Sequence, residues 1–131
     1  MSAEIQFEGS APWFACTDLV LAVDYYMNNL GFRGTWNWLW GDPPNHAGIS
    51  RGRTRILLYE DAEAAKRRRG MEHVIYVQNV KGLYAQYCAG EVSIVKELED
   101  RPWGTLDFTV ETPDGIRLIF TEAPKWNEEE K

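Results

Sequence analysis

Tryptophan residues are the side chains of this sequence whose type and spacing most clearly suggest chemistry. Trp36, Trp38 and Trp40 alternate along an apolar run, so in a β-strand they would share one face. An indole can stack on a flat ligand, and its face attracts a cation. Complete burial requires a partner for the indole N–H, whereas an open cleft does not. We therefore expect a ligand-binding aromatic surface, with packing in a core or dimer interface as the alternative.

Three further aromatic residues fit such a surface. Trp13 and Tyr76 each lie on the expected open side of a short strand, one in each half of the chain. Trp103 lies in a loop between Pro102, whose φ is fixed, and Gly104, which has no side chain. A tryptophan held in this way is seldom required for core packing, so we expect it to contact a ligand.

Acidic residues accompany the aromatic ones. Glu60 and Asp61 end a predicted strand and could supply negative charge to the aromatic surface, or they could form a solvated strand end. The formal net charge of −6 at pH 7 suits a cationic ligand and disfavours nucleic acid and anionic membranes as partners. The basic run at residues 66–69 is expected in a solvated loop.

Residues suited to nucleophilic or metal chemistry are sparse. His46 is expected in a solvent-exposed loop, and His73 is expected to be an ordinary strand residue. Cys16 and Cys88 lie in apolar patterns, which favours buried, reduced thiols over a disulfide or a metal pair. We expect no cofactor.

Composition places the chain among globular proteins. Its 131 residues, 44% hydrophobic and 26% charged, are most simply one domain. No stretch approaches the roughly 18 apolar residues of a membrane span, and the N-terminus does not read as a secretory signal. We therefore expect a cytoplasmic protein, with residues 1–10 as an N-terminal arm and residues 123–131 as a charged tail.

Two similar halves must position these side chains. The first, about residues 11–62, contains a strand near Pro12–Cys16, a helix from about Asp18 to a C-cap at Gly31, and strands at Phe32–Leu39, Ala47–Ser50 and Arg55–Glu60. A breaker-rich loop at residues 41–45 separates the first two of those strands. This half therefore has the order βαβββ.

The second half, about residues 71–122, repeats the order. Its elements are a strand at His73–Val77, a helix near Val80–Ala89, and strands at Ser93–Leu98, Thr105–Val110 and Ile116–Thr121. The last two strands flank Pro113-Asp114-Gly115, which predicts a β-hairpin. The predicted fold class is α+β, with two βαβββ modules in a single domain that form curved sheets around a cleft.

Three segments carry a family resemblance: Asp18–Phe32 with its Leu-Gly-Phe exit, Val77–Tyr84, and Pro102–Gly115 with its closing hairpin. With them the chain resembles the vicinal oxygen chelate superfamily, which includes glyoxalase I, ring-cleaving dioxygenases and bleomycin-resistance proteins. The resemblance is greatest to bleomycin-resistance proteins. It implies a homodimer with clefts shared between subunits and an exchanged N-terminal strand, with Pro12 as the hinge and Ile5–Glu8 in the arm.

The same resemblance implies a ligand. In bleomycin-resistance proteins, aromatic residues of both subunits enclose the flat bithiazole of the drug, and acidic residues attract its cationic tail. Trp103 matches the closing-loop tryptophan of that family, and Trp36 matches an aromatic position whose face Trp38 shares. The segment Asn37–Asn45 is difficult to align, which leaves the identity of the ligand open.

Metal enzymes of the superfamily use four positions on the concave, open faces of the sheets, filled by His, Gln or Glu. The resemblance places these near Ala11, Leu58, Glu72 and Ile119, and three of the four cannot bind a metal. A shift of the strand register by one residue would turn His73 towards the cleft, but it would also expel apolar neighbours from the core.

We therefore predict a protein without catalytic activity that sequesters a bleomycin-type antibiotic and so confers resistance. The alternatives are a divalent-metal-dependent lyase, isomerase or dioxygenase of the glyoxalase type, or a binder of another aromatic metabolite.

Overall fold

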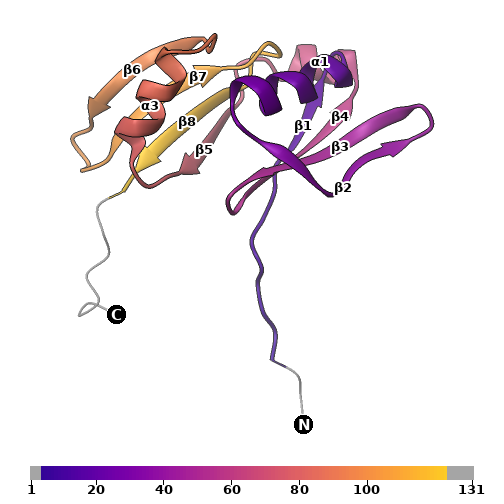
Figure 1. Cartoon of the computed structure of the whole chain (residues 1–131), viewed down its shortest axis with the longest axis horizontal. Coiled ribbons are helices and arrows are strands. Elements are labelled where there is room, and N and C mark those ends of the chain that lie inside the picture. The colour runs from indigo at the N-terminus through magenta and orange to yellow at the C-terminus, as the bar shows by residue number, and fades with distance from the viewer. Residues whose placement is uncertain (1–3, 124–131) are drawn as a thin grey trace.

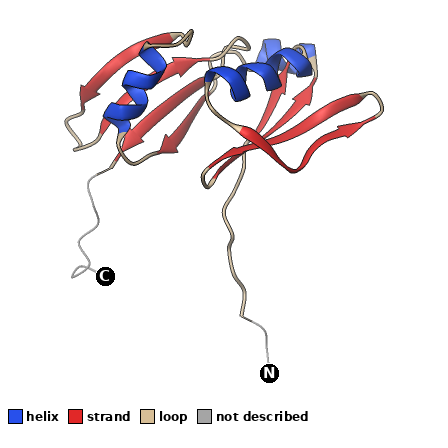
Figure 2. Ribbon diagram, in the orientation of Figure 1, coloured by secondary structure: helices blue, strands red, loops and turns tan. Residues whose placement is uncertain are grey.

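Two four-stranded sheets with the same strand order make up the molecule (Figures 1 and 2). The computed structural model of the chain describes residues 4–123, and of residues 36–38 the backbone only. The first sheet has the order β1-β4-β3-β2, with strands Trp13–Cys16 (β1), Arg33–Gly41 (β2), Pro44–Arg51 (β3) and Thr54–Glu60 (β4). The second has the order β5-β8-β7-β6, with strands Glu72–Tyr76 (β5), Ile94–Asp100 (β6), Leu106–Glu111 (β7) and Arg117–Glu122 (β8). In each sheet one pair is parallel, β1 with β4 and β5 with β8. The predicted α+β class and its duplicated βαβββ order are confirmed.

Each sheet has one main helix that follows its first strand. In the first sheet, α1 (Leu19–Asp24) continues into a π-helical segment, η1 (Tyr25–Asn29). Asp18 caps α1, because its carboxylate accepts a hydrogen bond from the Leu21 N–H at 3.1 Å. Gly31 follows with a φ of +81°, as a C-cap glycine requires. In the second sheet, α3 (Val80–Cys88) occupies the corresponding place.

A third helix, α2 (Ala62–Arg67), corrects the loop predicted for the basic run. The Ala64 N–H donates to the Asp61 carboxylate at 3.0 Å, and Ala64 and Ala65 pack against Ala15. The N-cap and the apolar contact together stabilise a helix whose last turn contains Lys66. The sequence did not predict this short helix, because its arginine-rich run was interpreted as a loop.

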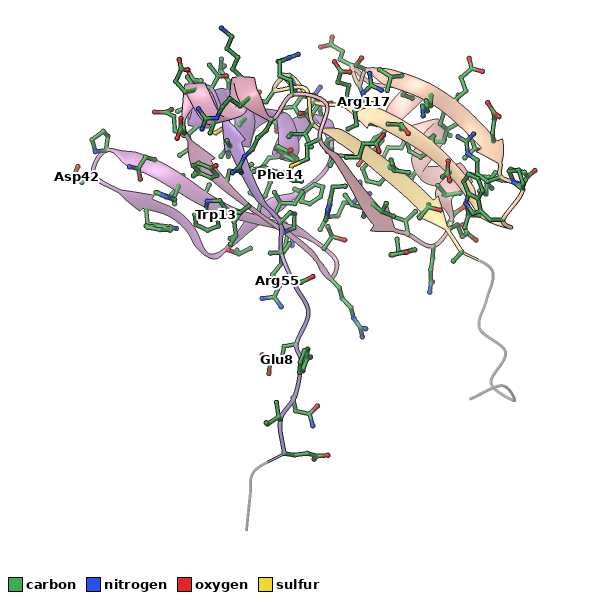
Figure 3. The ribbon with its side chains drawn as sticks, turned by 180° about the vertical axis from the view of Figure 1, so that it is seen from behind. Glu8, Trp13, Phe14, Asp42, Arg55 and Arg117 are labelled. Carbon is green, nitrogen blue, oxygen red and sulfur yellow. The ribbon has the colours of Figure 1, made fainter. Side chains whose placement is uncertain are left out.

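The β2–β3 hairpin corrects a second predicted loop. Residues 41–45 were expected to be irregular, but β2 continues to Gly41 and β3 begins at Pro44. The chain reverses within two residues, Asp42 and Pro43, and Gly41 has a φ of +103°, which glycine adopts without strain. Asp42 lies at the tip of the hairpin (Figure 3). The hairpin therefore places His46 in a strand, opposite Trp40.

The predicted closing hairpin is present. β7 and β8 pair antiparallel, and Glu111 faces Arg117 next to the turn. The Thr112 N–H donates to the Ile116 carbonyl at 2.9 Å, and Gly115 has a φ of +79°.

One apolar core joins both sheets to α1 and α3. Its members include Phe14 and Leu58 from the first sheet and Ile75 and Phe120 from the second. Leu58 is 1% exposed, which corrects its predicted place on the open face of the sheet. Because side chains alternate along a strand, Leu57 and Tyr59 occupy the open face instead.

The thiols and the N-terminal arm complete the fold. Cys16 is buried as predicted, whereas Cys88 is exposed because it lies on the outward side of α3; both are free.

Residues 4–11 extend away from the sheets (Figure 1), and Ile5 and Phe7 are 85% and 96% exposed. Within residues 4–123, no helix has the length and apolar character that a membrane span requires.

Candidate functional site

Four ring side chains gather on the open face of the first sheet, opposite its helix. His46 lies opposite Tyr59 across β3 and β4, and opposite Trp40 across β2 and β3. Ala15 pairs with Tyr59, so Trp13, two residues before Ala15, lies on the same face. Figure 3 shows Trp13 on β1, next to the core residue Phe14. We call Trp13, Trp40, His46 and Tyr59 the aromatic cluster.

The rings of the aromatic cluster are in contact, and they are close to parallel within two pairs, whereas Trp13 and His46 are tilted at 52° to one another. The Trp40 and His46 centroids lie 4.0 Å apart with an interplanar angle of 15°, and those of Trp13 and Tyr59 lie 5.6 Å apart at 28°. His46 also lies 5.7 Å from Trp13 and 6.5 Å from Tyr59, which connects the two pairs. The first sheet therefore carries one continuous ring surface rather than isolated aromatic residues.

This ring surface is open to a ligand. Trp13 and Trp40 are 43% and 42% exposed, His46 is half-buried between them, and Tyr59 is half-buried against Ala64 and Ala65 of α2. The His46 ring is held in place, since its Nδ1–H donates to Asn45 Oδ1 at 2.6 Å. Rings that are fixed and partly exposed can stack on a flat ligand without much loss of side-chain entropy.

The other predicted aromatic residues are distributed differently. The side chains of Trp36 and Trp38 lie outside the described residues. Tyr76 is 72% exposed on the open side of β5, and Trp103 is 71% exposed in the loop between β6 and β7. Among the described residues, neither ring contacts the aromatic cluster. They belong to the second sheet.

The predicted acidic residues serve as helix caps. Glu60 Oε1 accepts a hydrogen bond from the Leu19 N–H of α1 at 2.8 Å, and Asp61 caps α2. Glu122, at the equivalent end of β8, accepts from the Val80 N–H of α3 at 2.8 Å. Each carboxylate satisfies an N–H that the helix itself leaves unpaired. Glu60 is therefore directed towards α1 and away from the aromatic cluster.

The open face of the second sheet is polar rather than aromatic. Asp107, Thr109 and Thr121 are all buried there. Arg101 Nε donates to Asp107 Oδ1 at 2.7 Å, and Thr105 Oγ1 donates to Asp107 Oδ2 at 3.3 Å. Thr121 lies opposite Asp107, and its hydroxyl has no hydrogen-bond partner within the described part of the chain. The polar groups of this face are thus buried within the chain, whereas the first sheet exposes rings.

Nucleophilic chemistry finds little support in the described residues. The Cys16 thiol donates to the Tyr59 carbonyl at 3.3 Å, and burial, aided by nearby carboxylates, raises its pKa to about 12. A thiol with such a pKa stays protonated and unreactive at neutral pH.

The positions used by metal enzymes do not converge here. Leu58 lies in the core, Ile119 is half-buried on β8, and Glu72 is exposed at the start of β5. His73 faces the core, with its ring edge-on to Phe14 at 5.5 Å, and burial lowers its pKa. Among the described residues, no three His, Cys, Asp or Glu side chains come together to hold a metal ion.

Sequence reasoning missed two members of the aromatic cluster. His46 was expected in a loop, and the extent of the β2–β3 hairpin was the missing information. Tyr59 was missed because the run Ile56-Leu57-Leu58-Tyr59 is apolar throughout, so alternation does not reveal which residues face the core. Trp13 was correctly placed on the open face.

Several solved structures share this fold. A bleomycin-binding protein from bleomycin-producing Streptomyces verticillus, complexed with copper(II)-bleomycin, is 21% identical and has a TM-score of 0.74 over 93% of this chain and 100% of its own. TioX from Micromonospora sp. ML1 is 24% identical, with a TM-score of 0.75 over 88% and 100% of the two chains. A bleomycin resistance determinant encoded on transposon Tn5 is 17% identical, with a TM-score of 0.73 over 89% and 98%. At these identities the likeness establishes the fold alone.

The family is established by sequence as well. No curated protein matches the chain. The family model of the Glyoxalase/Bleomycin resistance protein/Dioxygenase superfamily, however, matches residues 13–120, from the start of β1 into β8. The duplicated βαβββ order, the closing hairpin and this match agree, and the chain belongs to the Glyoxalase/Bleomycin resistance protein/Dioxygenase superfamily.

Proposed function

We propose that this protein binds a flat, cationic antibiotic of the bleomycin type without transforming it, and thereby confers resistance. The aromatic cluster is the observation that carries this proposal. Its two indoles are partly exposed, and each is stacked on a neighbouring ring that holds it in place, which suits stacking on a planar heteroaromatic group. The bleomycin-binding protein named above, which has the same fold, supports the choice of ligand class.

The strength of such binding can be estimated from ring contacts. Stacking contributes about 0.5–1.5 kcal/mol per ring beyond area burial. A cationic group over an indole adds about 0.5–2 kcal/mol. Trp13 and Trp40 are both accessible, so these contacts supply part of the roughly 8 kcal/mol that a micromolar Kd requires. Burial of the apolar area of the ligand must supply the rest.

We propose further that the complete site is formed by a homodimer. In that arrangement the aromatic cluster of one chain faces the second sheet of its partner. Tyr76 and Trp103, which are exposed on the second sheet, would then supply rings from the opposite wall. Trp36 and Trp38 remain proposed ligand contacts on sequence grounds. Glu60 and Asp61 contribute only general negative charge, because their carboxylates cap helices.

The N-terminal arm is the proposed means of holding the dimer together. Phe7 and Ile5 are almost fully exposed within one chain, and exposed apolar side chains on an extended segment favour pairing with another subunit. Arg55 Nη2 donates to the Glu8 carbonyl at 3.2 Å, near the point where the arm leaves the sheet (Figure 3). Deleting residues 1–10 should therefore convert a dimer to a monomer in sedimentation velocity, and an unchanged dimer would argue against exchange.

Binding can be tested on the purified full-length protein. Titration with metal-free bleomycin should quench tryptophan fluorescence and saturate, since indoles line the proposed site. Absence of quenching at ~100 µM drug, a level that saturates micromolar binding, would contradict the proposal. Elemental analysis of the same preparation tests the enzymatic alternative. A stoichiometric zinc, nickel, iron or manganese ion held by the protein would argue against a purely sequestering role.

A further inference from the structure

A second cavity lies away from the aromatic cluster, where the two modules meet on their helix side. Its volume is about 710 Å³, within the range of roughly 300–1,000 Å³ typical of small-molecule sites. It is bounded by the β3–β4 turn at residues 51–54, by residues 75–79, and by one side of α3. None of the four aromatic cluster residues lines it, whereas Tyr76, a proposed drug contact on the second sheet, does. We call it the junction pocket.

The junction pocket combines an apolar floor with a basic rim. Phe32, Leu83 and Phe120 contribute apolar surface from both modules. Arg51 and Arg53 lie at the rim, and no Asp or Glu is among the lining residues. In a chain of net charge −6, two arginines make the lining of this pocket locally positive, while Glu8 lines the adjoining groove that Arg53 also borders.

The two arginines differ in how they are held. Arg51 Nη1 donates to the Leu30 carbonyl at 2.8 Å and to the Tyr87 hydroxyl at 3.3 Å, and its Nη2 donates to Gln86 Oε1 at 3.2 Å. Arg51 is therefore a fixed part of the wall. Arg53 is exposed on the turn, and within the described residues its guanidinium has no hydrogen-bond or ion-pair partner. Its donors remain free for a ligand.

We propose that the junction pocket binds a small amphipathic anion. The apolar body of the ligand contacts Leu83 and Phe120, and its carboxylate or sulfonate pairs with Arg53. Guanidinium groups favour such planar or trigonal anions because they donate parallel hydrogen bonds. This ligand is opposite in charge to the cationic drug of the proposed function. The protein would thus have two sites with opposite preferences, one on the open face and one on the helix side.

A pair of probes that differ in charge tests this site on the full-length protein. 8-Anilino-1-naphthalenesulfonate has an apolar body and a sulfonate, and N-phenyl-1-naphthylamine has the same body without the charge. Arg53→Gln should weaken binding of the anionic probe by about twofold to fivefold, the range expected for one exposed charge contact. It should leave the neutral probe unaffected. The matched control Arg68→Gln removes an equal charge from an exposed residue after α2, outside the pocket.

A second variant locates the probe. Arg53 also borders another groove, lined by Phe7 and Arg55. Leu83→Trp fills the junction pocket alone and should abolish binding of both probes, with an unchanged thermal unfolding curve confirming the fold. Trp13→Ala should leave probe binding unchanged, because it alters only the aromatic cluster. The result for the two probes is therefore independent of whether the protein binds bleomycin.

Three results would overturn the proposal. Equal affinity of the wild type and Arg53→Gln for the anionic probe would exclude the charge contact. Loss of probe binding in Trp13→Ala would move the site to the aromatic cluster. The third result concerns a chain that lacks residues 124–131. This segment follows β8 and contains one tryptophan and three glutamates. Affinity that rises more than tenfold in this truncated chain would show that the chain's own terminus, not a free ligand, is the natural occupant.

Discussion

The two sheets of this protein share a backbone plan and differ in the chemistry of their open faces. In both, the acidic residue that ends the last strand caps the main helix, Glu60 at Leu19 and Glu122 at Val80, each at 2.8 Å. One residue earlier, the same cross-strand position holds Tyr59 opposite His46 in the first sheet and Thr121 opposite Asp107 in the second. The first sheet thus has an aromatic pair at the position where the second sheet has a polar pair.

The comparison separates residues that maintain the fold from residues available for binding. Core-facing positions such as Leu58 and Phe120 are apolar in both modules, because both must pack against the shared core. On the open face of the first sheet, Ala15 and Tyr59 pack against α2, while Trp13 and Trp40 remain partly exposed and can diverge. In the proposed dimer, this ring surface would face the second sheet of the partner subunit.

The largest predicted effect tests the assignment of faces within one strand. Leu58→Ala should lower the free energy of unfolding by about 2–5 kcal/mol, because it leaves a cavity in the core. Leu57→Ala, the matched change on the open face, should lower it by less than about 1 kcal/mol. Urea denaturation of both variants measures the difference. Equal losses would mean that the faces of β4 are assigned wrongly.

The second prediction replaces an aromatic residue by its counterpart in the other sheet. Tyr59→Thr should weaken bleomycin binding by about 1–3 kcal/mol, because it removes one ring of the aromatic cluster while keeping a strand-compatible side chain. Calorimetric titration measures this loss. Leu21→Ala, which shortens an exposed apolar side chain on α1, is the control and should retain wild-type affinity. Similar losses of bleomycin affinity in both variants would contradict the assignment of the open face as the binding surface.

The third prediction concerns what the two sheets have in common. Glu60→Ala and Glu122→Ala should each lower the free energy of unfolding by about 1 kcal/mol, since each leaves a helix N–H without its acceptor. Glu60→Gln, which keeps an acceptor oxygen, should lose less. Drug affinity should remain close to that of the wild type. A marked loss of drug affinity in Glu60→Ala would contradict this prediction and indicate that the Glu60 carboxylate contacts the drug.

The fourth prediction is the smallest and depends on pH. Burial lowers the pKa of His73 below its ordinary value of 6.5, so the unfolded chain binds a proton before the folded chain does. Stability should therefore fall as the pH drops below 6.5, and the fall should level off once the folded chain is protonated too. Thermal unfolding between pH 7 and pH 5 measures it. His73→Gln should reduce the slope, whereas His46→Gln, on the open face, should retain it; the reverse result would contradict the assignment.

Much of the fold could be predicted from local sequence signals. Asp18, Gly31 and the turn at Pro113-Asp114-Gly115 each determine a nearby boundary by a local mechanism, and all three appear where expected. The π-helical segment η1 could not be foreseen, because one extra residue in a helical turn changes the apolar spacing very little. The helix α2 depends on contact with Ala15, which is distant in sequence.

The site was less predictable than the fold. Trp13 could be placed because its strand alternates clearly between the core and the open face. His46 and Tyr59 depend on the register of β2, β3 and β4, and that register is determined by packing across strands that are far apart in the sequence. The capping role of Glu60 likewise requires the position of α1 relative to the end of β4.

The most direct test of the aromatic cluster is calorimetric titration of metal-free bleomycin into the wild-type protein and Trp13→Ala. The aromatic cluster predicts saturable binding to the wild type with a Kd of about 1 µM or lower. It predicts an affinity lower by about 1–3 kcal/mol in Trp13→Ala, with the same circular dichroism spectrum. Equal affinity of the two proteins, or no binding to the wild type at ~100 µM drug, would contradict the assignment of this face as the drug site.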